Sequence, residues 1–485
     1  MALSEVEYSS HPEVGLPLCV DLDGTLVHTD TLHEMLIGAC RDWRVLPSLP
    51  LLFFSGRAKL KDGLSARLAF DPAHLPFNEP LIAWLREQRA TGRRLVLATA
   101  ASERTAVAVA EHLKLFDEVI ATTPTRNLRG AIKADALVER FGAEKFDYVG
   151  NDATDLAVWA KAAGAVLVGA SPRLRARAQQ VARVEREFPH RDGVGRELFR
   201  TLRVHQWSKN LLVFVPVITA RAIADVASVK AAMLMFLAFS ATASSIYVVN
   251  DLTDLAADRA HARKRMRPFA SGALPVHWGL LLAPALLTVG LALGVASHGI
   301  LPLLLYATIS VAYSLRLKEY PLVDIFTLAL LYTLRLYGGG SASGHYVSLW
   351  LLSFAGFLFL SLAAMKRVSE LAALRGTPEV ALRRRGYSNA DLPVLIGLGV
   401  SASMVSSHVL AVYARTMIPG DAGVHALLLW SVIPLMLFWQ CRMWLATARG
   451  YMLDDPIVYA ARDWVSRLVA LLVIVAFSLA AVSTP

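Results

Sequence analysis

The sequence predicts two folds in one chain: an N-terminal α/β domain with a small helical cap, and a C-terminal all-α membrane bundle of about nine transmembrane helices. Short apolar strands that end in polar residues alternate with helical segments over residues 1–172. Apolar stretches long enough to cross a bilayer recur from about residue 210 onward. The charged residues gather in the first two hundred positions and in a few later loops, so a polar part and a membrane part are expected.

The first expected strand, residues 18–20, runs directly into Asp21 and Asp23. This spacing places two carboxylates at the carboxyl end of a buried strand, where parallel sheets open a crevice. Other elements of the alternating pattern end or begin in polar residues in the same way: Thr99, Lys133, Asn151, Asp152 and Asp155. Residues from about 31 to 88 look helical and interrupt the alternation, so we expect a cap inserted after the first strand.

These motifs, in this order, resemble the haloacid dehalogenase (HAD) superfamily of phosphatases over about residues 15 to 172. The resemblance implies that Asp21 is a nucleophile that forms an aspartyl-phosphate and that Asp23 is the general acid and base. It also implies that Thr99 and Lys133 bind the transferring phosphoryl group. The Mg²⁺ site would combine Asp21 and Asp23 with the second acidic cluster: Asp152 or Asp155.

One position departs from the HAD pattern. Many relatives have an aspartate directly after the glycine at position 150, where this chain has Asn151. The metal ligand is then either Asn151, through its carbonyl, or Asp152 by a shift of one residue. A domain that binds phosphate without turning it over is an alternative that this substitution leaves open.

Residues 173–200 contain eight arginines interleaved with glutamates and small residues, and we expect a basic juxtamembrane linker, either on the anionic inner leaflet or solvated. The candidate spans follow it, at residues 209–223, 228–249, 277–296, 299–315, 321–340, 348–366, 393–414, 424–441 and 464–482. The first residues of the chain lack the basic start and apolar region of a secretory signal, so insertion is expected to begin with an internal helix.

The loops between the expected spans alternate in charge. Most of their lysines and arginines, including 259–267, 316–318, 366–385 and 442–462, lie on one side. The positive-inside rule places this set and the N-terminal domain in the cytosol of a bacterial inner membrane, with the C-terminus outside. The net charge of +10 is therefore assigned to lipid headgroups, and no nucleic-acid partner is expected. The three cysteines are far apart and indicate neither a disulfide framework nor a metal site.

The segment 250–268 places carboxylates and cations directly after a long apolar run. Asp251, Asp254 and Asp258 stand at i, i+3 and i+7, so we expect them on one helical face, where they can hold Mg²⁺ against a diphosphate. Cations that follow them can bind the other phosphate oxygens: Lys264, Arg265 and Arg267. The segment therefore predicts a polyanion site at a membrane surface.

Several elements in order resemble the UbiA superfamily of intramembrane prenyltransferases across residues 200–485. They are the run from Arg203 through Lys209 to Asn210, the segment 250–268, the run from Tyr313 to Lys318, and Asp324. Within that superfamily the sequence is most similar to the decaprenyl-phosphate phosphoribosyltransferase group, through these elements and through Lys366-Arg367-Val-Ser-Glu370 and Asp454-Asp455-Pro456. Aromatic prenyltransferases usually carry a second aspartate-rich repeat near Asp324, where this chain has one obvious acidic residue.

The resemblance implies that phosphoribosyl pyrophosphate (PRPP) is the donor and a polyprenyl phosphate the acceptor. Mg²⁺ on Asp251 and Asp254, with Asn250 and Asp258 nearby, would neutralise the departing pyrophosphate. Other members of the substrate site would be the residues that hold the sugar 5-phosphate or the lipid phosphate: Lys209, Asn210, Tyr313, Lys318, Asp324, Arg335 and Lys366. For Arg335, a structural pair with a carboxylate such as Asp324 is an equal alternative.

Together the two resemblances predict a bifunctional enzyme. The membrane half would make polyprenyl-phosphoryl-5-phosphoribose, and the HAD half would remove its 5-phosphate to leave a lipid-linked pentose for cell-envelope glycans. Two alternatives stay open. One is an aromatic prenyltransferase that uses a polyprenyl diphosphate; the other is a HAD part that senses a phosphorylated metabolite without turnover and gates the transferase.

Overall fold

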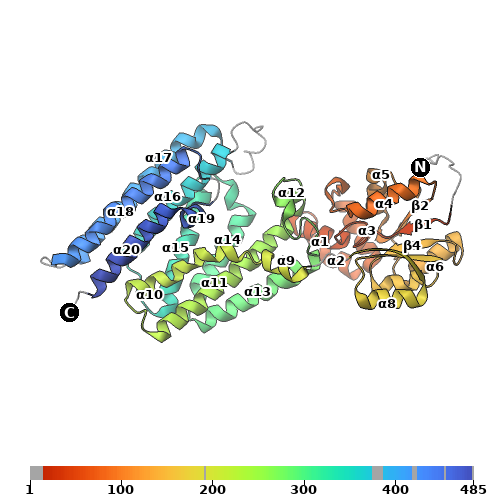
Figure 1. Cartoon of the computed structure of the whole chain (residues 1–485), viewed down its shortest axis with the longest axis horizontal. Coiled ribbons are helices and arrows are strands. Elements are labelled where there is room, and N and C mark those ends of the chain that lie inside the picture. The colour runs from red at the N-terminus through yellow and green to blue at the C-terminus, as the bar shows by residue number, and fades with distance from the viewer. Residues whose placement is uncertain (1–14, 190–192, 374–385, 418–422, 453–454, 483–485) are drawn as a thin grey trace. The chain divides into compact units, whose positions relative to one another are not determined.

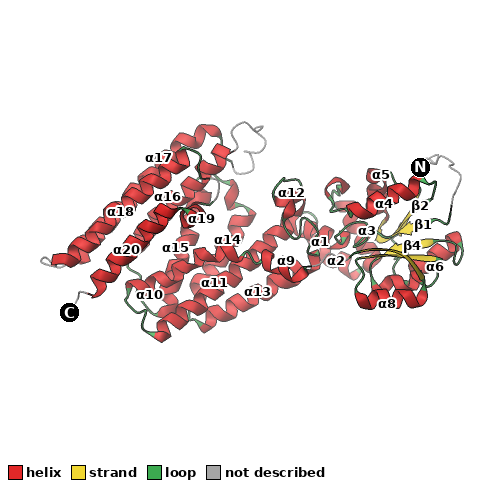
Figure 2. Ribbon diagram, viewed as in Figure 1, coloured by secondary structure: helices red, strands yellow, loops and turns green. Residues whose placement is uncertain are grey.

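The computed structural model describes residues 15–189, 193–373, 386–417, 423–452 and 455–482 (Figure 1). The chain divides into two compact units. The first comprises Met1–Leu202 with Tyr247–Ala283, and the second comprises Arg203–Ile246 with Pro284–Pro485. The acidic segment 250–268 therefore belongs to the same unit as the α/β domain. Among the described residues, the named strands all lie in that first unit (Figure 2).

The first unit contains a six-stranded parallel sheet in the order β3-β2-β1-β4-β5-β6. Its strands are β1 (Leu18–Val20), β2 (Leu95–Ser102), β3 (Glu118–Thr122), β4 (Asp147–Gly150), β5 (Gly164–Val168) and β6 (Arg183–Phe188). The parallel sheet expected from the alternating pattern is confirmed. Because β1 lies between β2 and β4, its three residues are fully buried. The residues that follow β1 therefore lie near the middle of the edge formed by the carboxyl ends of the strands.

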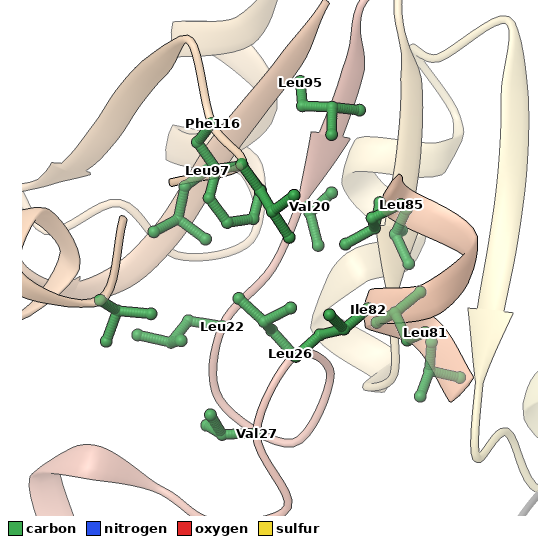
Figure 3. Packing of buried hydrophobic residues seen from close by; sticks show 14 of the residues in the cluster. Val20, Leu22, Leu26, Val27, Leu81, Ile82, Leu85, Leu95, Leu97 and Phe116 are labelled. Atoms are coloured by element: carbon green, nitrogen blue, oxygen red, sulfur yellow. The ribbon is translucent and has the colours of Figure 1, made fainter. Parts of the chain in front are cut away.

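Helices cover both faces of this sheet. Alternate residues of β1 enter different cores: Val20 packs with α4 (Glu79–Ala90) and α5 (Glu103–Leu113), whereas Cys19 packs with α6 (Ala131–Phe141), α7 (Leu156–Trp159) and α8 (Pro172–Val181). Figure 3 shows the first of these cores, with Val20, Leu22 and Leu26 against Leu81 and Ile82 of α4. These two apolar layers fix the loops that follow β1 and β4.

Helices are inserted after β1, as expected for a cap, but the inserted region is shorter than residues 31–88. It consists of α1 (Thr31–Arg41), α2 (Leu49–Phe54) and α3 (Arg57–Arg67), with short 3-10 turns at Leu46–Ser48 and Pro72–His74. Helix α1 starts where the Asp30 carboxylate accepts a hydrogen bond from the His33 amide. The cap has its own small core, which includes Met35 and Leu64. Helix α4 instead packs in the main core, so the cap ends before residue 79.

The sheet includes residues that the sequence pattern assigned to a basic linker. Helix α8 begins after the Ser171 cap, and β6 pairs in parallel with β5. Most residues of β6 are exposed, since it is the edge strand, and only Phe188 is buried. Charged side chains are common on edge strands because they discourage pairing with other chains. A charge-rich edge strand therefore has the composition of a linker.

The remainder is helical. The elements are α9 (Val194–Thr201), η4 (Val204–Phe214), α10 (Val215–Thr219), α11 (Val226–Thr253), α12 (Leu255–Arg259), η5 (Lys264–Met266), α13 (Val276–Ala296), α14 (Ile300–Leu315), η6 (Leu317–Glu319), α15 (Val323–Ser343), α16 (Leu349–Ala373), η9 (Asn389–Asp391), α17 (Leu392–Met417), α18 (Gly423–Ala448), α19 (Pro456–Arg462) and α20 (Trp464–Val482).

The expected spans correspond to helices, with one exception. Residues 209–223 form the end of a 3-10 stretch and the five-residue α10 in place of a long helix. Among the described residues, four helical segments are long and apolar enough to cross a membrane: Val226–Thr253, Val276–Ala296, Leu349–Ala372 and Asn389–Arg415. The helices at 300–315 and 464–476 are shorter but also apolar. A count of nine spans is not confirmed.

Candidate active sites

The carboxyl end of β1 carries a buried ion pair. Lys133 of α6 donates a hydrogen bond to Oδ1 of Asp21 at 2.8 Å and another to the Tyr148 hydroxyl at 2.7 Å. The carboxylate of Asp155 lies 3.9 Å from the same ammonium group. The sheet thus brings together three elements whose polar residues were expected to meet: β1, α6 and the loop after β4.

Burial and charge act against each other in this cluster. Burial raises the pKa of Asp21 to about 6, although Lys133 lowers it. Burial would lower the pKa of Lys133, but the carboxylates of Asp21 and Asp155 outweigh it and raise the pKa above its usual value. Lys133 is therefore a fixed positive charge at the end of β1, as the binding of a phosphoryl group requires.

Asp23 faces the cap. Its carboxylate accepts hydrogen bonds from the backbone amide of Thr31 at 2.9 Å and from the Thr31 hydroxyl at 3.3 Å. Burial, and then the nearby charge of Asp30, raise its pKa to about 7. A carboxyl group that titrates near neutrality can both donate and accept a proton during a reaction. The role of general acid and base expected for Asp23 is compatible with this environment.

Two further groups surround this crevice. The Thr99 hydroxyl is buried and accepts a hydrogen bond from the amide of Ala101 at 3.0 Å, and Thr99 lies within β2, which continues to Ser102. Lys61 of the cap helix α3 donates to the Ala100 carbonyl at 2.5 Å and to Asn127 Oδ1 at 3.2 Å. Burial lowers the pKa of Lys61. Lys61 was not among the expected site residues, because Arg57, Lys59 and Asp62 give its segment the charged composition of a solvated helix.

The three candidates for the metal ligand after β4 have different surroundings. Asp155 is buried and accepts hydrogen bonds from the amides of Asn151 (3.0 Å) and Asp152 (3.1 Å) and from the Tyr148 hydroxyl. The Asp152 side chain is exposed and caps the turn through the amide of Ala153 at 2.6 Å. Asp155 also lies 3.9 Å from Lys133, which binds Asp21.

Asn151 is the residue of the three that contacts this loop. Its carbonyl oxygen accepts a hydrogen bond from the Thr25 hydroxyl at 3.2 Å. Gly24 has φ of +75°, and a Cβ there would lie 2.2 Å from the Asn151 amide nitrogen, so the turn and the amide are in direct contact. Oxygen donors from Asp21 and Asn151 fit Mg²⁺, although the set has one carboxylate fewer than if position 151 were aspartate.

The acidic segment of the same unit is not one continuous helix. Helix α11 ends at Thr253, and Asp254 is the residue before α12. Arg267 donates to Asp251 at 3.1 Å and to Asp258 at 2.5 Å, and both carboxylates are buried. Asp254 instead lies 3.8 Å from Arg41 of α1. The three carboxylates therefore do not form the single group that the spacing predicts: Asp251 and Asp258 share Arg267, whereas Asp254 lies beside Arg41.

This pair could still serve a magnesium diphosphate. Among the described residues no group of three or more His, Cys, Asp or Glu side chains is arranged to hold a metal. Mg²⁺ is, however, commonly held by one or two carboxylates together with substrate phosphates. Asp251 and Asp258 can bind Mg²⁺ in this way if the Arg267 guanidinium moves from the two carboxylates to a phosphate of the substrate. Asn250 is half-buried at the end of α11, and Lys264 and Arg265 are exposed on η5.

In the second unit, two of the expected phosphate-binding lysines share one carboxylate. Lys209 of η4 and Lys366 of α16 contact Oδ2 of Asp455 at 3.0 Å and 3.2 Å. Burial would raise the pKa of Asp455, but Lys366 and Lys209 lower it to about 2. Two cations against one anion leave a net positive charge, which can accept a phosphate group. The neighbouring Asp454 lies outside the described residues, as do residues 374–385.

Arg335 is buried within α15, but its partner is not Asp324. It donates through Nε to Asn210 Oδ1 at 2.7 Å and through Nη2 to the Tyr306 hydroxyl at 3.0 Å. Asn210 in turn donates to the Ser240 hydroxyl at 3.0 Å. The alternative of an Arg335–Asp324 pair is thus wrong. The two hydrogen bonds of Asn210 therefore join η4 to α15 and to α11.

Asp324 belongs to another buried network. It accepts hydrogen bonds from Arg367 and from the Tyr387 hydroxyl, and Arg367 also donates to the Tyr313 hydroxyl at 2.8 Å. Arg367 is only 1% exposed. Its role was not anticipated, since Lys366 beside it carried the phosphate-binding expectation. Lys318 is half-buried on η6.

Comparison with known proteins identifies both parts of the chain. The model of the UbiA prenyltransferase family matches residues 212–451. A decaprenyl-phosphate phosphoribosyltransferase of Mycobacterium tuberculosis is 30% identical over 287 residues, which are 56% of this chain and 90% of the relative. The chain belongs to the UbiA prenyltransferase family. It is accordingly an integral membrane protein.

The UbiA part is joined to a second known domain. The model of the haloacid dehalogenase-like hydrolases matches residues 18–160. The y4nM protein of Sinorhizobium fredii is 36% identical over 472 residues, which are 96% of this chain and 91% of that protein, so both parts occur together in it. Among solved structures, a UbiA homolog from Archaeoglobus fulgidus bound to GPP and Mg²⁺ has a TM-score of 0.45 and 20% identity, over 59% of this chain and 98% of that one.

Proposed function

We propose that this protein is a bifunctional enzyme of the bacterial inner membrane. The UbiA part transfers 5-phosphoribose from PRPP to a polyprenyl phosphate such as decaprenyl phosphate and releases pyrophosphate. The HAD domain then removes the 5-phosphate and leaves polyprenyl-phosphoryl-ribose, a pentose donor for cell-envelope glycans. The HAD domain and the basic loops face the cytosol, and the C-terminus lies outside.

One observation carries this proposal: the chain covers 90% of a relative that is named a decaprenyl-phosphate phosphoribosyltransferase. Two features of the structure support it. Asp251 and Asp258 share Arg267, which is a suitable arrangement for a magnesium diphosphate and its counter-charge. The lysine pair on Asp455 supplies a separate excess of positive charge for a second phosphate.

The transfer step needs charge neutralisation more than proton transfer. An oxygen of the lipid phosphate attacks C1 of the ribose, and the bond from C1 to the pyrophosphate oxygen breaks, with its electron pair leaving on pyrophosphate. Bound Mg²⁺ would neutralise that leaving group. Arg267 contributes a guanidinium that can bind two phosphate oxygens once it leaves the carboxylates. Lys209 and Lys366 hold the lipid phosphate or the sugar 5-phosphate.

The positions of Asp21, Asp23 and Lys133 support the hydrolytic step. The Asp21 carboxylate attacks phosphorus while Asp23 protonates the departing 5-oxygen of the sugar. Asp23 then takes a proton from the water that splits the aspartyl-phosphate and releases inorganic phosphate. Lys133, with Thr99, binds the phosphoryl oxygens throughout.

Two other functions would fit parts of the structure. An aromatic prenyltransferase would need one diphosphate site and an apolar acceptor pocket, but the paired lysines on Asp455 favour a second phosphate. A HAD domain that only senses phosphate is favoured by Asn151, since one carboxylate fewer weakens Mg²⁺ binding.

The test follows pyrophosphate release by purified protein supplied with PRPP, polyprenyl phosphate and Mg²⁺. Release must require both substrates and must be lost in Asp251→Asn, whereas Asp21→Asn must retain it. Radiolabelled PRPP then shows whether Asp21→Asn accumulates a lipid that still carries the 5-phosphate. Equal lipid products from wild type and Asp21→Asn would remove the hydrolytic step, and release without the lipid acceptor would remove the transfer.

A further inference from the structure

The cap of the HAD domain and the acidic segment lie in the same unit and are joined by a buried ion pair. Arg259 of α12 binds Glu34 of α1 through two parallel contacts, at 2.6 Å and 2.9 Å. Only 7% of the Arg259 side chain and 15% of the Glu34 side chain are exposed. Figure 1 shows α12 beside α1.

Each residue of the ion pair also makes a hydrogen bond to a third group. Arg259 also donates through Nε to the carbonyl of Ala270 at 3.0 Å, and Glu34 accepts the Thr29 hydroxyl at 2.5 Å. A bidentate pair with its other hydrogen bonds satisfied has one preferred geometry, so a shift of one partner is transmitted to the other. An exposed ion pair would transmit little, because its side chains reorient freely in water.

Further contacts surround the pair. Arg41 of α1 donates to the carbonyl of Thr253, and a Cβ on Gly272 would lie 2.5 Å from the Cβ of His28. A cavity of about 560 Å³ lies beside the pair, between α1 and the segment, and Trp43 and Leu252 are among its lining residues. Arg41 and Thr253 also line this cavity, so the contacts between α1 and the segment lie beside open space.

Each partner is adjacent to one of the two candidate sites. Glu34 lies one helical turn after Thr31, whose amide and hydroxyl hold the carboxylate of Asp23. Arg259 directly follows Asp258, which shares Arg267 with Asp251. A continuous set of contacts thus connects the general acid of the HAD domain to the carboxylates proposed for the diphosphate.

We propose that Glu34 and Arg259 are positioning residues that couple the two sites, so that the ligand bound at the acidic segment sets the position of Asp23 in the HAD domain. A diphosphate with Mg²⁺ would draw Arg267 away from Asp258, move the five-residue α12, and move α1 through the ion pair. Hydrolysis would then follow the transfer step. The identity of this ligand rests on the proposed function; the coupling itself rests on the contacts above.

The test is hydrogen exchange on the full chain in detergent micelles, with and without Mg²⁺ and methylenediphosphonate, a diphosphate that cannot be hydrolysed. In the wild type, the probe is expected to change exchange both at residues 250–259 and at residues 31–41, by about fivefold or more at the most responsive amides. In Glu34→Gln and Arg259→Gln the change at 250–259 stays and the change at 31–41 is lost. The matched control is Arg263→Gln, an exposed cation near α12, which must behave as the wild type.

A second readout separates coupling from general loosening of the fold. With p-nitrophenyl phosphate as a small phosphomonoester, the probe changes kcat of the wild type and leaves KM unaltered, and the two variants lose this response. The double variant Glu34→Gln/Arg259→Gln should be no worse than either single variant, because one contact is being removed. No change at residues 31–41 while 250–259 respond, or a response that survives in Glu34→Gln, overturns the coupling. No response at 250–259 counts against the diphosphate site itself, and thus against both proposals.

Discussion

Directly after β4, the amide side chain of Asn151 contacts the loop that follows β1. Asn151 contacts Thr25 and Gly24, whereas the carboxylate of Asp155 is used to fix the turn and to hold Tyr148 near Lys133. We therefore expect the residue at position 151 to affect how strongly the HAD domain binds a divalent cation.

Replacing Asn151 by aspartate should tighten the binding of Mg²⁺. An added carboxylate in an oxygen-ligand site raises cation affinity, and we expect a gain on the order of tenfold. The measurement is the Mg²⁺ concentration that gives half-maximal hydrolysis of p-nitrophenyl phosphate. Asp152→Asn, at the exposed neighbouring carboxylate, is the matched control and should leave that concentration unchanged. The reverse pattern would make Asp152 the ligand.

Arg367 is the residue on which the Asp324 network depends. It joins Asp324, Tyr313 and Glu370 from a fully buried position. Its removal leaves the Asp324 carboxylate, which is 0% exposed, without its charged partner.

We expect Arg367→Met to destabilise the membrane part by about 3–5 kcal/mol, the usual cost of breaking a buried ion pair from one side. Thermal denaturation in detergent, followed by tryptophan fluorescence, measures this. Arg316→Met, at an exposed arginine near η6, should change the midpoint little. A midpoint for Arg367→Met as high as that of Arg316→Met would contradict the network.

At the scale of elements, the sequence predicts those strands and helices whose patterns are apolar or periodic. The strands β1, β2 and β4, helix α6 and the long helices of the membrane part all lie where expected. The sequence of edge strand β6 indicates a linker, because it is rich in charged residues, including Arg183, Glu185 and Arg186, and only Phe188 is buried. The break between α11 and α12 was missed because the spacing of the three aspartates continues the helical period across it.

Partners of buried charges were harder to predict than the charges themselves. The sequence indicates that Arg335 within an apolar run needs a partner, but not that Asn210, 125 positions away, provides it. The same holds for Lys61 and Arg367, whose partners are set by how distant elements pack. Spacing along the chain carries no information about such contacts.

Phe188→Ala tests whether β6 is part of the sheet. Phe188 packs in the core beside Trp84, so its truncation should cost about 3–5 kcal/mol of stability in the HAD domain. Limited proteolysis of the full chain during heating reports this, since cleavage within residues 15–189 should begin at a lower temperature. Val181→Ala, at an exposed position at the end of α8, is the control. If residues 173–189 were a solvated linker, the two variants would behave alike.

In the whole molecule, we propose that two active sites act in turn on one lipid product. The UbiA part would create a phosphomonoester at the membrane surface, and the HAD domain of the same chain would hydrolyse it. The y4nM relative, which matches nearly the entire chain, carries both parts. Joining them in one polypeptide raises the effective concentration of the intermediate at the second site.

The mass of the lipid product tests this claim most directly. Purified protein is incubated with PRPP, decaprenyl phosphate and Mg²⁺, and the lipid extract is analysed by mass spectrometry. The account predicts decaprenyl-phosphoryl-ribose from the wild type and its 5-phosphorylated form from Asp21→Asn. A wild-type extract in which the decaprenyl phosphate is recovered without any added pentose would contradict it.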